Sequence, residues 1–217
     1  MRKQFDEELQ ELHAHFTRMG VLVTEALIKA VKSFVDHDVE AAEIVIAEDE
    51  QINKKEIELE SECARLIALQ QPVVTDLRMI VSVMKACSDL ERMGDHARSI
   101  ARTTIRVKGN KRIPEVEIQI SDMSKIVVEM ASRVLTAYVN GDVQEAKAIA
   151  KLDSRVDDYM LEITQFSIAE MKADPKVVYN GSGYISAASN LERIGDYITN
   201  ICERIVYTKT GELVELN

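Results

Sequence analysis

The sequence has no tryptophan, and its 217 residues include only three prolines, eight glycines and 5% aromatic residues. β-Sandwiches and β-barrels need frequent turns, so this scarcity argues against both. The three cysteines, Cys63, Cys87 and Cys202, lie far apart and form no Cys-x-x-Cys pair. A disulfide framework or a thiolate zinc site is therefore not expected, and reduced thiols in a cytosolic compartment are.

Long apolar runs and an excess of positive charge are also missing. No run reaches the roughly eighteen apolar residues that a membrane-spanning helix needs. The N-terminus turns acidic within the first nine residues and has no apolar core, unlike a signal peptide. The net charge of −10 disfavours nucleic acid and anionic lipid as main partners and favours cations and basic protein surfaces. Together these features predict a cytoplasmic protein.

The sequence does contain a strong helical pattern, and the pattern occurs twice. Apolar residues within 5–30 recur at alternating steps of four and three residues, which is typical of a long helix in a bundle. A second series with the same steps covers 116–137 and lies 104 residues after the stretch 12–33. Two series in register indicate a duplicated unit.

Turn signals divide each unit into three helices. Asp142 and Glu145 form a capping-box pattern directly after Gly141, a residue that commonly ends a helix. The second helix is expected to stop near Pro72 in the first unit. In the second unit it is expected to stop near 174–175, where an aspartate followed by proline starts the next helix.

The segment 108–114 lies between the two triplets and is the obvious linker. We therefore predict an all-α protein with six long helices in two tandem, sequence-related three-helix bundles, residues 1–109 and 110–217. Helices of about 30 residues would each be roughly 45 Å long, and the slender bundles would lie side by side or end to end.

The third helices match most closely. Residues 88–95 read Ser-Asp-Leu-Glu-Arg-Met-Gly-Asp, and 189–196 read Ser-Asn-Leu-Glu-Arg-Ile-Gly-Asp. Each segment places a glutamate and an aspartate one turn apart on the flank of the buried face. Like charges at this spacing oppose each other by roughly a few tenths of a kcal/mol, so something should compensate them.

The second helices carry a partial echo of these acidic pairs, Asp49 with Asn53 and Asp153 with Asp157. If helices two and three pack antiparallel, each unit can bring three or four oxygen ligands to one surface. Oxygen ligands suit magnesium, manganese, calcium or oxidised iron. The alternative is that the carboxylates are solvated and neutralised by nearby arginines, Arg92 and Arg193.

Glycines interrupt both acidic helices, at Gly94 and Gly195. A glycine inside a helix costs about 1 kcal/mol relative to alanine. Its presence indicates either the close approach of a neighbouring helix or an acidic cluster that needs room.

Chemistry beyond cation binding has little support. The chain shows no nucleophile–base pair and no phosphate-cradling loop, so we do not expect an enzyme. A carboxylate-bridged oxidase or iron store stays an alternative, although the Glu-x-x-His pairs of such bundles are missing. A metal-free structural scaffold is a second alternative. Three further titratable residues are interpreted as surface residues: His13, His15 and His37.

The doubled Leu-Glu-Arg-x-Gly-Asp segments, the Asp76-Leu77-Arg78 segment and the twin triplets resemble the PhoU family of bacterial phosphate-transport accessory and regulatory proteins. The resemblance covers essentially the whole chain. It implies two three-helix bundles with multinuclear metal sites at acidic motifs. It also implies a negative regulator of the phosphate-starvation response, which connects a phosphate ABC transporter with a sensor histidine kinase in the membrane.

The resemblance also implies the ligands of the metal: Glu91, Asp95, Glu192, Asp196, Asp153, Asp157 and Asp49. The ion would be a divalent or trivalent metal such as iron, zinc, manganese or magnesium. Asn53 departs from the acidic pattern, which predicts a weaker site in the first unit. The implied partners are the transporter ATPase and the sensor kinase, with the membrane reached only through them. A homodimer is an open possibility, since exposed flanks of long bundles often self-associate.

Overall fold

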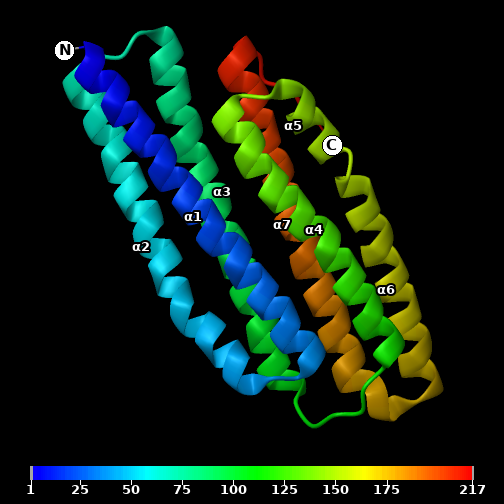
Figure 1. The fold of residues 1–217 in the computed structure, drawn as a ribbon. Coiled ribbons are helices and arrows are strands. Elements are labelled where there is room, and N and C mark those ends of the chain that lie inside the picture. Colours follow the sequence, from blue (N-terminus) through cyan, green and yellow to red (C-terminus); the bar gives the residue numbers. More distant parts are fainter. Residues whose placement is uncertain (1, 217) are drawn as a thin grey trace.

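The computed structural model describes residues 2–216, and side chains from residue 3 onward. All regular secondary structure of the described residues is helical: α1 (Arg2–Asp36), α2 (Val39–Gln70), α3 (Val74–Val107), α4 (Pro114–Asn140), α5 (Val143–Ala150), α6 (Asp153–Ala173), the 3-10 turn η1 (Pro175–Val177) and α7 (Val178–Thr210). Figure 1 shows α1 to α3 as one antiparallel bundle and α4 to α7 as a second bundle beside it. The predicted all-α fold of two three-helix bundles is confirmed, and the bundles lie side by side.

The second helix of the second bundle is interrupted and consists of α5 and α6. α5 ends at Ala150 and α6 begins at Asp153, whereas α2 continues through the corresponding positions of the first bundle. At the break, the Leu152 N–H donates to the carbonyl of Ile149, and the Arg155 N–H donates to the carbonyl of Leu152. Bonds to the third residue back belong to a 3-10 turn, which is tighter than an α-helix. The break places Asp153 in the first turn of α6.

The predicted turn signals act as expected. Gly141 ends α4 in the left-handed region at φ 60°, and the Asp142 side chain accepts bonds from two backbone N–H groups of α5. The Asp174 side chain accepts from the Lys176 N–H, and Pro175 opens the short turn η1 that leads into α7. These signals are local in the sequence, because each cap bonds to residues two or three positions away.

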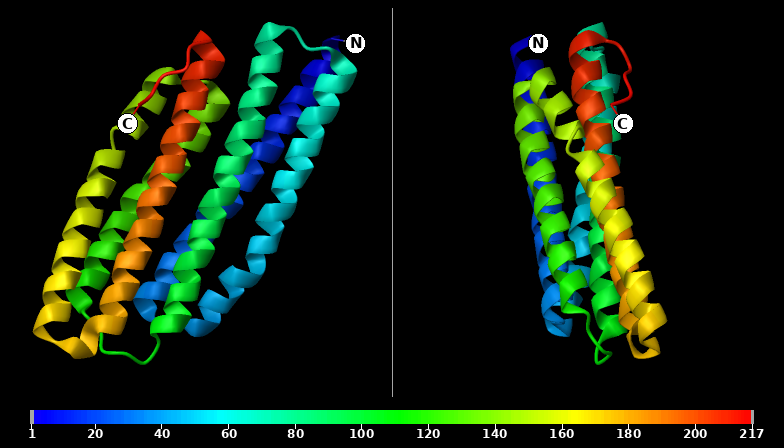
Figure 2. Two further views of the ribbon diagram at one scale, coloured as in Figure 1. Left: turned by 180° about the vertical axis from the view of Figure 1, so that it is seen from behind. Right: turned by 90° about the vertical axis from the view of Figure 1, so that its right-hand side faces the viewer.

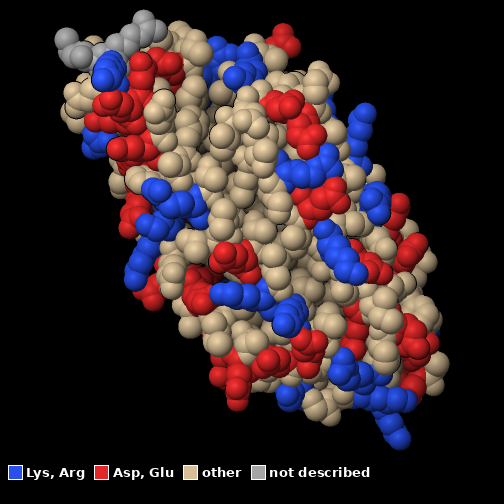
Figure 3. Space-filling model, in the orientation of Figure 1, with Lys and Arg blue, Asp and Glu red and all other residues tan. Residues whose placement is uncertain are grey.

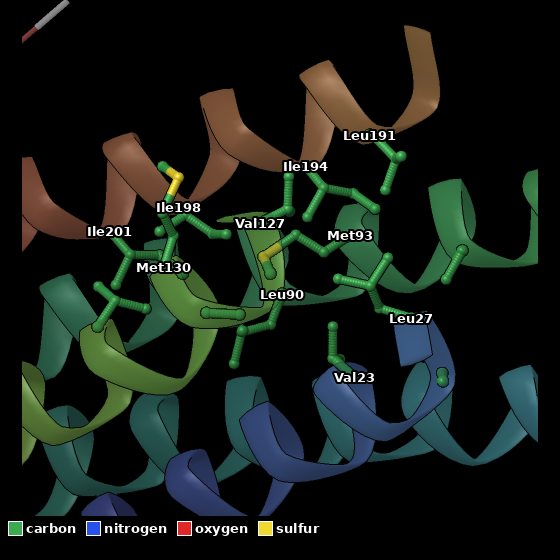
Figure 4. Close-up of a cluster of buried hydrophobic side chains, with 14 of the residues drawn as sticks. Val23, Leu27, Leu90, Met93, Val127, Met130, Leu191, Ile194, Ile198 and Ile201 are labelled. Carbon is green, nitrogen blue, oxygen red and sulfur yellow. The ribbon is translucent and has the colours of Figure 1, made fainter. Parts of the chain in front are cut away.

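Buried side chains of both bundles form one continuous apolar core. α3 packs along α7, and α1 packs on α4, so each bundle covers part of the other. Figure 4 shows side chains from these four helices meeting in the centre: Val23, Leu27, Leu90, Met93, Val127, Met130, Leu191, Ile194, Ile198 and Ile201. Each such side chain stabilises the fold by about 1.5–3 kcal/mol when fully buried. The linker therefore separates two repeats that share one core.

A buried polar network ties the linker to both bundles. The Glu117 carboxylate of α4 is 4% exposed and accepts bonds from Arg112 and from the Tyr184 hydroxyl. Its Oε1 also lies 2.8 Å from His37 Nε2. Burial would raise the pKa of Glu117, but these three hydrogen bonds outweigh it and lower the pKa. The predicted surface position of His37 is wrong, because the α1–α2 turn folds the ring against Glu117 and leaves it 9% exposed.

The other two histidines are partly buried rather than fully at the surface. His13 packs beside the ring of Tyr138, and burial lowers the pKa of His13. His15 Nδ1 lies 2.7 Å from the carboxylate of Glu62 on α2. The pattern of α1 alone missed both contacts, because Tyr138 belongs to α4 of the second bundle and Glu62 to α2, far from α1 in the sequence.

Charges and apolar residues separate on the face formed by α1 and α4. Figure 3 shows acidic and basic side chains mixed along the outer flanks and a strip of uncharged residues between the two helices. A groove of about 460 Å³ runs along this strip, lined in part by Thr17 and Val21 of α1 and by Leu135 and Val139 of α4.

Among the residues that the structure describes, none of the helices combines the length and the apolar character that crossing a membrane requires.

Candidate functional site: two acidic clusters

Two acidic clusters lie where the third helix of each bundle packs on the second. The second cluster consists of Asp153 and Asp157 of α6 with Glu192 and Asp196 of α7. All four residues line one open depression of about 510 Å³, together with Ala150, Lys151, Ser154 and Leu216. The structure thus brings together the four carboxylates that the sequence singled out in the second unit.

The carboxylates of the second cluster disfavour one another's charge. Burial raises the pKa of Asp157 and of Glu192, and the negative charge of Asp196 raises both further. Asp153 is only 5% exposed. On the solvent side, Arg193 lies 3.3 Å from Asp196 and 3.8 Å from Glu192, but its own side chain is 58% exposed. An exposed ion pair is worth little, so the cluster keeps a field that favours a cation.

The glycines let the facing helices come close. A Cβ atom on Gly195 would lie 2.5 Å from Asp153 Oδ1, a distance that carbon and oxygen do not tolerate. A Cβ atom on Gly94 would lie 3.1 Å and 3.2 Å from two side-chain carbons of Ile52. Both parts of the interpretation hold, since a neighbouring helix approaches each glycine and a cluster carboxylate sits against Gly195.

The first cluster consists of Asp49 of α2 with Glu91 and Asp95 of α3. An arginine side chain of α3 supplies positive charge to it. Arg98 places one nitrogen 2.8 Å from Asp49 Oδ2 and another 2.8 Å from Asp95 Oδ1. The residue in the corresponding position of the second motif, 101 residues later, is Thr199, which is buried and uncharged. The two clusters therefore differ in where their neutralising charge comes from.

Both repeats match the same family of known proteins. The model of the PhoU domain matches residues 16–104 and again residues 120–205, one match for each repeat. The chain belongs to the PhoU family. It is 43% identical over all 217 residues to the phosphate-specific transport system accessory protein PhoU homolog of Streptococcus pneumoniae, with both chains fully covered. It is 36% identical to the homolog of Clostridium acetobutylicum, over 100% of this chain and 99% of that one.

Solved PhoU structures share the fold over nearly the whole length. The phosphate transport system regulatory protein PhoU from Streptococcus pneumoniae gives a TM-score of 0.91 at 41% identity, covering 97% of this chain and 99% of that one. PhoU from Pseudomonas aeruginosa gives a TM-score of 0.91 at 33% identity, covering 96% of this chain and 100% of that one.

The second cluster of this PhoU-family chain fits a hard cation better than the first. Four carboxylates on an open surface supply the oxygen ligands that magnesium, manganese or iron prefer. Their side chains do not yet converge: in the part of the chain described, no three carboxylate, imidazole or thiol side chains stand close enough to hold an ion as they lie. The acidic side chains would have to turn toward a common point inside the depression.

The first cluster is a weaker candidate, because Arg98 already bonds two of its carboxylates. Two buried oxygens at this cluster, Asp49 Oδ1 and Asn53 Oδ1, accept no hydrogen bond from the described residues. A water molecule or a small cation would satisfy them. The residues therefore leave room for a ligand but less net negative charge to hold one than the second cluster has.

Sequence reasoning named only one of the two arginines that matter here. Arg193 does contact its cluster, as expected. Arg92 instead lies over the ring of Tyr197, with its Cζ 6.0 Å from the ring centre. The missed residue is Arg98, and its position three residues after Asp95 was a usable signal, because residues at that spacing share one helix face.

Proposed function

We propose that this protein is an accessory and regulatory protein of a phosphate transport system. The observation that carries the proposal is the similarity of the whole chain, with both acidic motifs present, to proteins that bear that name. The proposal includes the finer role of a negative regulator of the phosphate-starvation response. In that role the protein acts as an adaptor between the ATPase of a phosphate ABC transporter and a sensor histidine kinase.

We infer that the second cluster holds a metal cation in this adaptor. Asp153, Asp157, Glu192 and Asp196 would be its ligands, and Asp49, Glu91 and Asp95 would form a weaker counterpart. A bound cation supplies positive charge that neutralises carboxylates which otherwise raise one another's pKa. The support for this inference is that the four carboxylates line one depression and that Thr199 stands where the first cluster has Arg98.

A deletion strain tests the regulatory role. Removal of this protein, with the transporter intact, should switch on phosphate-starvation genes while phosphate is plentiful. A reporter fused to a starvation promoter measures the effect, and the intact gene supplied in trans should restore repression. Unchanged expression in the deletion strain would contradict the adaptor role.

The partners need a separate test, because a regulator can act without bridging two proteins. A pull-down from phosphate-replete cells should recover the transporter ATPase and the sensor kinase together. Recovery of neither would remove the support for a bridging role. Sedimentation analysis of the purified protein decides whether it forms the homodimer that the sequence leaves open.

A further inference from the structure

A second polar site lies on the seam between α3 and α7. Figure 2 shows these two helices side by side on the face opposite to α1 and α4. Between them is a shallow pocket of about 360 Å³, which we call the α3–α7 pocket; its lining residues are Ser99, Arg102, Thr103, Arg106, Ser186 and Asn190. No carboxylate lines the pocket, although the chain carries a net charge of −10.

Three of the lining side chains donate hydrogen bonds to backbone carbonyl groups of the protein itself. The hydroxyls of Ser99 and Thr103 donate to carbonyl groups of α3 itself. The amide nitrogen of Asn190 donates to the carbonyl of Ser186, and its oxygen lies 2.8 Å from His96 Nδ1. These contacts fix the walls of the pocket and leave its remaining donors to a ligand.

The remaining donors are two guanidinium groups and one hydroxyl. Among the described residues, Arg102 and Arg106 form no ion pair or hydrogen bond, and the Ser186 hydroxyl has no partner. Both arginines are exposed. Burial raises the pKa of Asp49, and the charge of Arg102 makes only a minor contribution in the opposite direction. Arg98, one turn before Arg102, by contrast bonds two carboxylates.

The duplication shows that this basic pair is specific to one end of the seam. The residues 101 positions after the two arginines are Glu203 and Tyr207, and Asp89 stands where the pocket has its asparagine. The corresponding end of the seam thus carries carboxylates. If helix packing alone required these residues, both copies would carry the same residue types. We therefore attribute the arginine pair to a role other than packing.

We propose that the α3–α7 pocket binds a phosphate group, either as inorganic phosphate or as a phosphate monoester, through Arg102, Arg106 and the Ser186 hydroxyl. A guanidinium fork donates two parallel bonds to a pair of phosphate oxygens. Two forks four residues apart on one helix face, with Cβ atoms about 5–6 Å apart, reach two edges of one tetrahedral anion. A planar carboxylate fills only one fork. This site is separate from the acidic clusters and does not depend on the proposed function.

Calorimetric titration at constant ionic strength tests the proposal on the full-length protein. The ligands are inorganic phosphate and a phosphoserine peptide, with acetate as a planar anion for comparison. Arg102→Gln with Arg106→Gln should weaken phosphate binding by about tenfold or more, because charged donors are lost. Glutamine keeps helix propensity, so the variant should fold as wild type does by circular dichroism.

The matched control removes the same charge elsewhere. Arg18→Gln with Lys32→Gln changes two exposed residues of α1, on the opposite face, and should leave phosphate binding within about twofold of wild type. Binding of inorganic phosphate alone identifies a free anion as the ligand, and binding of the peptide alone identifies a phosphate monoester. Three results would overturn the site: equal binding by wild type and the double arginine variant, binding of neither phosphate ligand, or acetate binding as tightly as phosphate.

Discussion

The contact between Gly195 and Asp153 makes a quantitative prediction. Alanine at position 195 gains about 1 kcal/mol of helix propensity. Its methyl carbon would lie 2.5 Å from the carboxylate oxygen of Asp153, a side chain that is only 5% exposed. Forcing a buried side chain aside costs about 1–3 kcal/mol. We therefore expect Gly195→Ala to lower the free energy of unfolding by up to about 2 kcal/mol.

Gly94 offers a comparison within the same molecule. The methyl carbon of Gly94→Ala would lie 3.1 Å from a side-chain carbon of Ile52, so the neighbour has to move by only a few tenths of an ångström. The smaller clash and the gain in propensity should nearly cancel. For a chain of this size, 1 kcal/mol shifts Tm by roughly 2–4 °C. Gly195→Ala should thus melt several degrees below Gly94→Ala.

Urea denaturation followed by circular dichroism, with a chelator present, measures both variants without any contribution from bound metal. The decisive control is the Asp153→Ala background, in which the clashing carboxylate is gone. There Gly195→Ala should stabilise the protein by about 1 kcal/mol, because only the propensity effect is left. The reasoning fails if Gly195→Ala is more stable than wild type while Asp153 is present, since the glycine would then not be wedged against α6.

Two further predictions concern charge. Glu192→Ala with Asp196→Ala should lower bound metal more than Glu91→Ala with Asp95→Ala does, because Arg98 already pairs with two carboxylates of the first cluster. Elemental analysis of untagged protein measures the metal, and equal content in wild type and both variants would count against coordination there. Burial raises the pKa of Asp89 to about 6, against the opposing charge of Arg204. Below about pH 4 the carboxyl is protonated in both the folded and the unfolded chain and costs no stability. As the pH rises through 6 the buried carboxyl ionises, and the free energy of unfolding falls. Asp89→Asn should therefore stabilise the protein by about 1–3 kcal/mol more at pH 8 than at pH 4 in denaturant titrations, and a difference that does not change with pH would refute this assignment.

The features that the sequence predicted well are those that depend on nearby residues. The seams of α1 and α4, the cap at Asp142 and the stop at Gly141 all follow from spacings of a few positions. The second cluster was predictable for a related reason. The duplication aligns Asp153 and Asp157 with Asp49 and Asn53, so the same polar pattern occurs at matching positions in both repeats.

The missed features depend on contacts between residues far apart in the chain. His37 is buried by Glu117, which lies 80 residues later, and nothing near the α1–α2 turn announces that partner. The break between α5 and α6 was missed because the heptad pattern continues across Leu152 without a proline or glycine. A periodic pattern identifies one buried face, but α1 contacts both α3 and α4 and so has a second one.

The bridge made by Arg98 has a consequence for how the two halves respond to their surroundings. A cation attached to the chain stays at a fixed local concentration, so dilution, a chelator or a change in ion supply does not remove it from Asp49 and Asp95. At the second copy Thr199 takes the place of Arg98, and Arg193, which pairs with Asp196 and Glu192, has a side chain that is 58% exposed. The first copy of the motif is thus less sensitive to the ionic composition of the cell than the second, because salt screens exposed ion pairs more strongly than half-buried ones.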